Sequence, residues 1–347
     1  MSQLKILIIG AGALGSYLGG RLMLAGQRVV FLGKAAVAQV LAEKGLSIHY
    51  ASKLLHIQPI EVTSSLDQAL LCDVFDLILV VIKAYDTPSL IDSLKPFKEH
   101  LPPILVLQNG VENEDQFRSC FGKEQVIAGT VTSAISRKET GEIVVEKERG
   151  IGIATENEFS RRLIQVFRQA GFRVKGYPRA ADMKWSKLIT NQLVNASCAI
   201  LGMTPRAVLS HPASFRLEML QIRETLTVMN AHKIYVTDLP ATPVRLLAWS
   251  IRSLPLWLSR PLLGRFVAKG RGNKMPSLYL DLKAGKRQSE VDALNGAVVR
   301  FGERVHLPTP ANRFLWQTLN AMIQGTIPLD AFRYSPQKLL EAYLLSS

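Results

Sequence analysis

The sequence predicts two domains: an N-terminal α/β domain with a doubly wound, mostly parallel sheet, and an all-α C-terminal domain. Short apolar runs alternate with helical segments over the first 180 residues, and a glycine-rich turn joins the first run to the first helix. From Asp182 onward, nearly every segment has helical periodicity. Because 347 residues exceed the usual size of one hydrophobic core, we expect domains at residues 1–180 and 181–347.

The elements of the first domain follow from periodicity and from the residues that end each run. Residues 76–82 (DLILVVI) form a continuous apolar run, typical of a strand buried on both faces of a parallel sheet. Gly26 is the expected end of the first helix. Residues 126–155 are predicted as strands joined by turns. The other expected elements are strands at 5–9, 27–32, 104–107 and 172–175, and helices at 16–25, 35–43 and 160–170.

Charge and composition narrow the class of partner. The net charge is +14, and its excess lies in the second half, where 21 basic residues oppose 10 acidic ones from Ala181 onward. Such a balance suits nucleic acid, an anionic membrane surface or anionic small molecules. Nucleic acid is the least favoured, because no helix-turn-helix, zinc-finger or RNP pattern accompanies the charge. The charge therefore leaves an anionic small molecule or an anionic membrane surface as the partner, and no nucleic acid is expected.

The cysteines and the apolar runs predict a cytoplasmic protein. Cys72, Cys120 and Cys198 are widely spaced and form no metal-binding pattern, so we expect reduced thiols and no metal. The N-terminal apolar run is broken by glycines and is predicted as a mature strand rather than a signal peptide. No run reaches the roughly 18 apolar residues of a spanning helix, so no integral membrane association is expected.

The glycine-rich turn matches the dinucleotide-binding pattern G-x-G-x-x-G in its usual context, between a strand and a helix. Its residues are Gly10, Ala11, Gly12, Ala13, Leu14 and Gly15. The first glycine permits the tight turn, the second lets backbone approach a pyrophosphate, and the third lets the helix pack closely. The N-terminus of the helix then faces the phosphates. The first domain is thus predicted to be of the Rossmann type; a packing-driven glycine cluster is the alternative.

The second strand indicates which dinucleotide binds. A site that prefers NAD places Asp or Glu at this strand end to bind the ribose 2′-hydroxyl, whereas here the strand leads to Gly33 and Lys34. A cation at this place suits the 2′-phosphate of NADP. The expected cofactor is NADPH/NADP, with a solvated surface lysine as the alternative reading of Lys34.

A polar stripe marks the candidate catalytic residues. Residues 185–201 are predicted as one largely buried helix, on which Lys187, Asn191 and Asn195 recur at a spacing of four and share a face. A lysine can protonate the alkoxide formed when a carbonyl is reduced, and amides can hold substrate oxygens. Lys83 and Asn109 follow apolar strands, at the sheet edge where ligands bind. The alternative is a solvated helix face.

Five segments together carry a resemblance to a known family. They are GAGALG, DLILVVIKAYDT, LQNGVEN, KWSKLITNQLVNA and SLYLDLKAGKRQSEVDALNGAVVR. In this order and spacing the chain resembles the 2-dehydropantoate 2-reductase (ketopantoate reductase) family from end to end. The resemblance implies a Rossmann domain followed by a helical substrate domain, with the active site in the cleft between them. It also implies reduction of ketopantoate to pantoate with NADPH, in the pantothenate and coenzyme A pathway.

The resemblance also implies residue roles. Lys187 matches the catalytic lysine, and Asn191 and Asn195 match substrate-positioning amides. Ser277 matches a residue that contacts the substrate carboxylate, and Glu290 matches a carboxylate beside the cofactor ribose and the lysine. Lys83 and Asn109 match contacts on the nicotinamide side, and Asn109 is also assigned to the substrate. From the residues alone, Ser277 could be only a helix cap, and Glu290 could only open a helix behind Ser289.

One segment departs from the family and keeps other functions open. Residues 239–280 contain no Asp or Glu but seven cations between Arg245 and Lys274, interleaved with Leu and Trp. A helical hairpin with a solvated basic face is expected; a substrate lid and an interfacial membrane helix are alternatives. The substrate could thus be another 2-keto or 2-hydroxy acid, and a non-catalytic NADP-sensing protein is the other alternative. A homodimer is compatible with the sequence.

Overall fold

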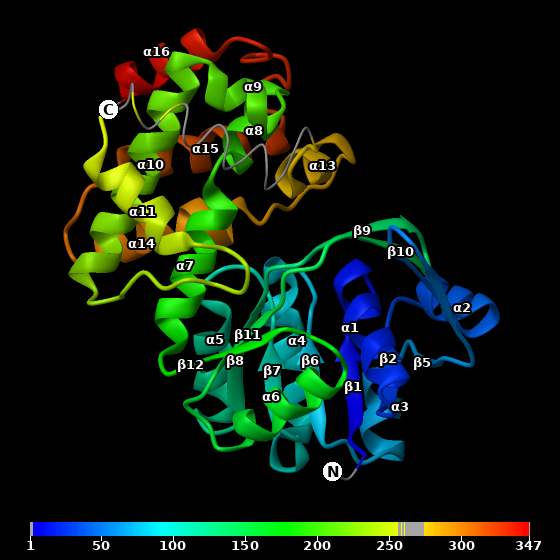
Figure 1. Cartoon of the computed structure of the whole chain (residues 1–347). Coiled ribbons are helices and arrows are strands. Elements are labelled where there is room, and N and C mark those ends of the chain that lie inside the picture. The colour runs from blue at the N-terminus through cyan, green and yellow to red at the C-terminus, as the bar shows by residue number, and fades with distance from the viewer. Residues whose placement is uncertain (1–2, 256–257, 259, 261–273, 347) are drawn as a thin grey trace. The chain divides into compact units, whose positions relative to one another are not determined.

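The computed structural model describes residues 3–255, 258, 260 and 274–346. The chain divides into two compact units, each of which we describe by itself. Unit 1 comprises Met1–Gln108, Glu112–Lys184 and Leu239–Thr242, and unit 2 comprises Asn109–Val111, Trp185–Asp238 and Pro243–Ser347. The predicted fold class, a mostly parallel α/β sheet followed by helices, is confirmed (Figure 1).

In the described part of the chain, the main sheet of unit 1 has eight strands in the order β12-β11-β8-β7-β6-β1-β2-β5. Their bounds are β1 Lys5–Ile9, β2 Arg28–Leu32, β5 Glu61–Thr63, β6 Leu77–Val80, β7 Ile104–Val106, β8 Val126–Val131, β11 Ile151–Ala154 and β12 Val174–Tyr177. Only the β8–β11 pair is antiparallel among these neighbours. From β1 the chain adds β2 on one side and later β6 on the other. This change of direction makes the carboxyl ends of β1 and β6 a topological switch point, where ligands of such sheets bind.

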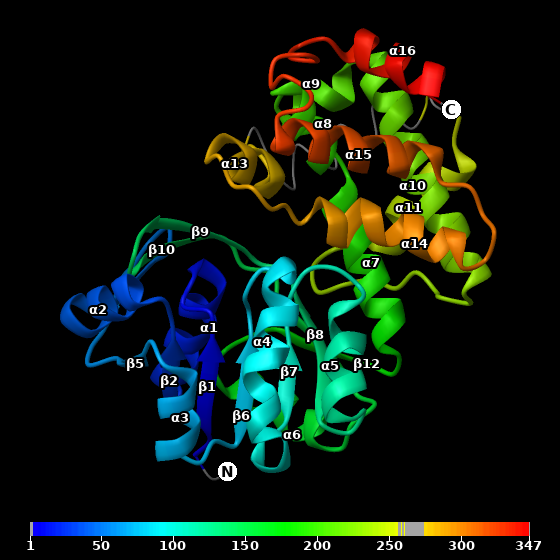
Figure 2. The same ribbon diagram turned by 180° about the vertical axis from the view of Figure 1, so that it is seen from behind.

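Both faces of the main sheet are covered, as the apolar run at residues 76–82 predicts. On β1, Ile6 and Ile8 join one buried cluster whereas Leu7 and Ile9 join another, because successive side chains point to opposite faces. Helices α1 (Ala13–Leu24) and α6 (Phe159–Gln169) pack on the first face. Helices α3 (Leu66–Cys72), α4 (Thr87–Leu94) and α5 (Asn113–Phe121) pack on the second (Figures 1 and 2).

A second, four-stranded sheet has the order β4-β3-β10-β9. Its strands are β3 Leu46–His49, β4 Leu54–Ile57, β9 Ala134–Glu139 and β10 Glu142–Lys147. The strands predicted within residues 126–155 are therefore present but divided between two sheets. The small sheet packs on α1, where a Cβ at Gly20 would come within 3.0 Å of side chains from Leu46, Ile48 and Ile57.

Unit 2 is built from helices around the 20-residue helix α10 (Pro212–Ala231), which contacts α9, α11, α14, α15 and α16 (Figure 2). The bounds of the others are α8 Asn195–Leu201, α9 Pro205–Ser210, α11 Val244–Ser253, α13 Ser277–Lys283, α14 Ala297–Glu303, α15 Pro310–Gln324 and α16 Pro336–Ser346. Helix α7 (Ala180–Gln192) contributes its first residues to unit 1 and its later ones to unit 2.

The basic segment at residues 239–280 is described only in part. Helix α11 forms a first arm, with Leu246 and Trp249 exposed. The second arm of the predicted hairpin falls mainly on residues 256–273, which apart from 258 and 260 lie outside the described residues. Among the helices that the structure describes, none is long and apolar enough to cross a membrane.

Candidate active site

The glycine turn has the geometry that its pattern predicts. Gly10 follows β1 directly with φ +114°, a conformation that other residues rarely adopt. At Gly15 a Cβ would lie 1.9 Å from the Gly10 carbonyl oxygen, so only glycine lets α1 start this close to the turn. By contrast, a Cβ at Gly12 would meet no atom within 4 Å. The fold therefore requires Gly10 and Gly15, whereas a constraint at Gly12 would have to come from a bound group.

The surroundings of Gly12 fit the pyrophosphate of a dinucleotide. Gly12 is the N-cap of α1, no side chain caps the helix there, and its first turn contains no acidic residue. The N-terminal N–H groups and the positive end of the helix dipole are thus directed at the turn, a favourable environment for phosphate. Ala11, Ala13 and Leu14 complete the turn with partly buried side chains.

Lys34 lies at the carboxyl end of β2, separated from the strand by Gly33. It is exposed and is the N-cap residue of α2 (Ala35–Lys44), whose first turn also contains no acidic residue. The predicted absence of a ribose-binding carboxylate directly after β2 is thus matched by the local structure. The environment favours an anion beside Lys34.

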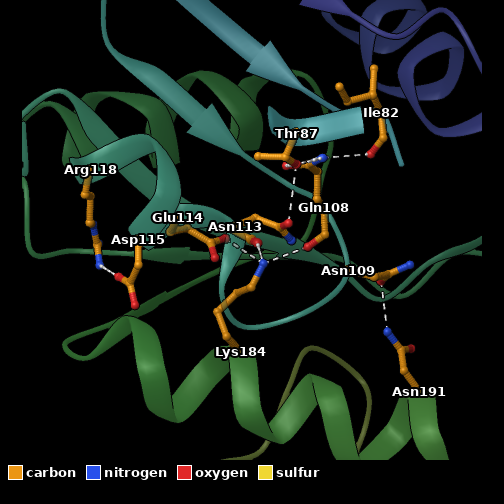
Figure 3. A network of polar contacts seen from close by, with 11 residues as sticks. Ile82, Thr87, Gln108, Asn109, Asn113, Glu114, Asp115, Arg118, Lys184 and Asn191 are labelled. Carbon is orange, nitrogen blue, oxygen red and sulfur yellow. Dashed lines mark hydrogen bonds and ion pairs between the residues drawn. The ribbon is translucent and has the colours of Figure 1, made fainter. Parts of the chain in front are cut away.

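Lys83 and Asn109 stand on neighbouring turns at the carboxyl ends of β6 and β7. The turns are linked by the buried side chain of Gln108, whose Nε2 lies 3.2 Å from both the Ile82 and the Lys83 carbonyl oxygens. The same Nε2 donates to Thr87 Oγ1 at 2.9 Å. Figure 3 shows Gln108 beside Thr87 and Ile82. The backbone that carries the two predicted nicotinamide contacts is therefore tied together by one amide.

The predicted single helix over residues 185–201 is wrong, because the chain forms two helices. Helix α7 ends at Gln192, Val194 adopts a left-handed conformation with φ 59°, and α8 begins at Asn195. Lys187 and Asn191 thus remain one turn apart on α7, whereas Asn195 lies on α8. The stripe spacing of four therefore does not place all three side chains on one helix face.

The break is held by a buried carboxylate that the sequence reading missed. Glu218 on α10 is fully buried; its Oε2 accepts the Val194 N–H at 2.6 Å, and its Oε1 accepts the Ser197 hydroxyl. A β-branched residue at positive φ is strained, so it needs such a partner. No local signal marks the break, because residues 193 and 194 are apolar and lack Gly and Pro.

Asn191 and Asn195 have different partners. Asn191 is half-buried, and its Nδ2 donates to Asn109 Oδ1 at 2.9 Å (Figure 3). Asn195 is buried, and its Oδ1 accepts the Leu278 N–H at 3.2 Å, at the start of α13. The structure therefore brings Asn191 together with Asn109, and Asn195 together with the residue that follows Ser277.

Ser277 and Glu290 have surroundings that separate their alternative roles. Ser277 is exposed and is the first residue of α13; the N-cap position belongs to Pro276, so Ser277 is not the cap. Glu290 is 3% exposed, just before the helical turn at Val291. There Ser289 Oγ accepts the Val291 N–H at 3.2 Å, as expected of a helix start.

Lys187 is half-buried, but a second lysine on α7 is nearly inaccessible. The side chain of Lys184 is 4% exposed, and its Nζ lies 2.6 Å from Glu114 Oε1. It also donates to the Gln108 carbonyl oxygen at 2.7 Å. Lys184 is therefore unsuited to protonate a substrate. The only signal for it in the sequence is a lysine between the apolar residues Met183 and Trp185.

Two family models match the chain, one described as ketopantoate reductase PanE/ApbA over residues 6–157 and one as the C-terminal part of that family over residues 179–323. The chain belongs to the ketopantoate reductase family. The 2-dehydropantoate 2-reductase of Pyrococcus horikoshii is 26% identical over 325 residues, covering 92% of this chain and 97% of the relative. That of Archaeoglobus fulgidus is 28% identical over 329 residues, covering 92% and 98%.

Solved structures agree with the family membership. A PanE/ApbA family ketopantoate reductase from Ralstonia eutropha JMP134 matches with a TM-score of 0.78 at 27% identity, over 93% of this chain and 99% of that one. A D-mandelate dehydrogenase with NADH and anilino(oxo)acetate matches with a TM-score of 0.76 at 21% identity, over 93% and 99%, which shows the shared fold alone. This ketopantoate reductase family member is an oxidoreductase of the 2-dehydropantoate 2-reductase type, with a nicotinamide cofactor and a small keto acid substrate.

Proposed function

We propose that this protein reduces a 2-keto acid, 2-dehydropantoate, to the 2-hydroxy acid pantoate with NADPH. The observation that carries the proposal is the arrangement on α7, where the half-buried Lys187 precedes Asn191 by one turn and Asn191 is bonded to Asn109. A lysine beside oriented amides supplies both the proton and the hydrogen-bond donors that carbonyl reduction needs. The curated relatives named for this reaction support the choice of substrate.

Bound NADPH supplies a hydride to the keto carbon of the substrate. The Lys187 ammonium group donates a hydrogen bond to the keto oxygen and transfers its proton as negative charge develops there. Asn191 and Asn195 hold the substrate oxygens so that this oxygen stays within reach of the lysine. Of the two N–H groups on Asn191 Nδ2, one goes to Asn109, which fixes the direction of the other.

The remaining predicted residues bind the two ends of the ligands. We assign the exposed hydroxyl of Ser277 to the substrate carboxylate and the buried Glu290 to the cofactor ribose and the ammonium of Lys187. Lys83 and Asn109 are assigned to the nicotinamide, and Asn109 also to the substrate. Gly10 to Gly15 and Lys34 are assigned to the pyrophosphate and the 2′-phosphate. In this scheme residues 1–180 are the NADP-binding domain and residues 181–347 the substrate domain, with Glu290 reaching the cofactor and Asn109 the substrate.

A second candidate is reduction of another 2-keto acid by the same residues. It is favoured by the basic segment at residues 239–280, which departs from the family pattern, and by the modest identity to relatives that carry the ketopantoate name. We place either reaction in the cytoplasm, in keeping with three cysteines that form no disulfide in the described structure. A homodimer remains a proposal for the assembly.

Steady-state kinetics with a panel of 2-keto acids test the proposal. Purified protein is given NADPH or NADH, and loss of absorbance at the reduced nicotinamide is followed for 2-dehydropantoate, 2-ketoisovalerate and phenylglyoxylate. We expect the highest kcat/KM with 2-dehydropantoate and NADPH. A higher value with another acid would establish the second candidate. Tight NADPH binding without turnover of any acid would instead support the NADP-sensing alternative.

A further inference from the structure

Lys184 and Glu114 form a buried ion pair that the proposed reaction does not use. Their side chains are 4% and 5% exposed, and the ammonium nitrogen lies 2.6 Å from the carboxylate (Figure 3). Burying two charges costs free energy that their attraction only partly returns, and apolar residues of similar size often stabilise a fold as well. The presence of the pair therefore calls for an explanation beyond stability.

The ammonium of Lys184 also holds the backbone at two places in the main sheet, on β8 and in the turn just after β7. Its Nζ donates to the Gln108 carbonyl oxygen at 2.7 Å and lies 3.3 Å from the Gly129 carbonyl oxygen on β8. The ammonium group is thus held by two backbone carbonyl oxygens in addition to its ion pair with Glu114. Gln108 is the residue immediately before Asn109, so the lysine fixes the backbone from which Asn109 extends.

The same network reaches the neighbouring turn. The Gln108 carbonyl is held by Lys184, while the Gln108 side chain lies within 3.2 Å of the Ile82 and Lys83 carbonyl oxygens. Gln108 is 3% exposed and cannot readily exchange these partners for water. Displacing Lys184 should therefore affect the turns of both Lys83 and Asn109.

We propose that Lys184, with Glu114 and Gln108, is a positioning residue for the nicotinamide end of the cofactor site. The inference rests on the proposed function, which assigns Lys83 and Asn109 to the nicotinamide. Lys184 touches neither substrate nor cofactor in this account. It holds the two turns in the geometry that hydride transfer needs, and small displacements from such geometry lower the rate steeply.

The test uses the full chain carrying Lys184→Met together with Glu114→Gln. Changing both residues avoids leaving one charge buried without its partner, so we expect a melting temperature close to that of the wild type. The affinity of the variant for NADPH is compared with its affinity for adenosine 2′,5′-bisphosphate, which keeps the adenine end of the cofactor but lacks the nicotinamide. We expect kcat to fall at least about tenfold while affinity for the bisphosphate stays unchanged.

A control removes a solvent-exposed ion pair from the opposite strand ends of the same unit. Arg28 and Glu61 begin β2 and β5 and pair at 2.8 Å. Arg28→Met with Glu61→Gln should leave kcat and both affinities unchanged. Should the Lys184 double variant fail to fold, Gln108→Met breaks the link to Ile82 and Lys83 without exposing a buried charge. In this variant too, kcat should fall while affinity for the bisphosphate stays unchanged.

Three results bear on the proposal. A folded double variant with wild-type kcat and NADPH affinity would overturn it, because the network would then be only structural. Equal losses of NADPH and bisphosphate affinity would also overturn it, since they would report general damage to unit 1. If the wild type reduced no 2-keto acid, but the variant lost NADPH affinity and kept that for the bisphosphate, positioning would stand and the proposed function would fail.

Discussion

Two lysines three positions apart on α7 have different surroundings and hence different chemistry. Lys184 is enclosed by a carboxylate and two carbonyl oxygens, so its proton has no route to a substrate. Lys187 is only half-buried, which leaves room for its ammonium to meet a ligand. Because the two side chains are chemically the same, their burial decides which lysine is suited to act as the acid.

Lys34 is the residue on which we expect the choice of dinucleotide to depend. Lys34→Asp should lower affinity for NADPH by about tenfold and narrow the preference over NADH, because a charge-assisted contact to the 2′-phosphate is lost and a repulsive one replaces it. Dissociation constants from fluorescence titration measure this effect.

The control for this change lies on the same helix. Lys44→Asp makes an identical charge change at the exposed last residue of α2. It should leave the ratio of the two affinities as it is. If the wild type bound NADH more tightly than NADPH, or if both variants behaved alike, the assignment of Lys34 would be wrong.

The break between α7 and α8 shows how one element is shaped by another. Glu218 on α10 accepts the N–H of Val194 and the hydroxyl of Ser197, and thereby sets where α8 begins. Asn195, the first residue of α8, then accepts the Leu278 N–H of α13. The Glu218 carboxylate thus fixes the backbone at Asn195, which we propose to bind the substrate.

Two substitutions of Glu218 test this dependence. Glu218→Gln keeps an acceptor for the Val194 N–H, whereas Glu218→Ala leaves that buried donor unsatisfied. The alanine variant should have a free energy of unfolding lower than that of the glutamine variant by about 1–3 kcal/mol, measured by urea titration. It should also have the higher KM for the keto acid. Equal stability of the two variants would show that the hydrogen bonds do not hold the break.

Local sequence predicts some elements of the fold and not others. Strands β1, β6 and β7 were predicted within a few residues, because strands buried on both faces are continuous apolar runs. The small sheet was not, because β3 is short and carries the polar residues Ser47 and His49, and its partner β10 lies about 95 residues away along the chain. The helix break escaped prediction for a similar reason, since Glu218 is remote from Val194 in sequence.

The residues of the candidate site also differ in whether local sequence marks them. Lys187, Asn191 and the glycine turn could be predicted as candidates because their spacing is local and their chemistry is specific. Lys184, Glu114 and Gln108 were missed because a buried ion pair between residues 70 positions apart leaves no periodic signal. Only folding reveals that this lysine holds the backbone next to Asn109.

At the scale of the whole molecule, the proposed reaction draws on residues of both compact units. Unit 1 contains the glycine turn and Lys34, whereas unit 2 contains Lys187, Asn191 and Asn195. Cofactor binding and proton transfer are therefore expected to respond to different substitutions. This separation makes the central proposal, that Lys187 is the general acid, open to a direct test.

That test is the kinetics of Lys187→Ala, with Lys338→Ala on the exposed surface of α16 as the control lysine of the same unit. A general acid contributes roughly 10²–10⁴-fold to the chemical step, so kcat of Lys187→Ala should fall by about that factor while its dissociation constant for NADPH stays close to that of the wild type. Lys338→Ala should keep both values. A folded Lys187→Ala protein that binds NADPH and reduces its best 2-keto acid at the wild-type rate would contradict the account.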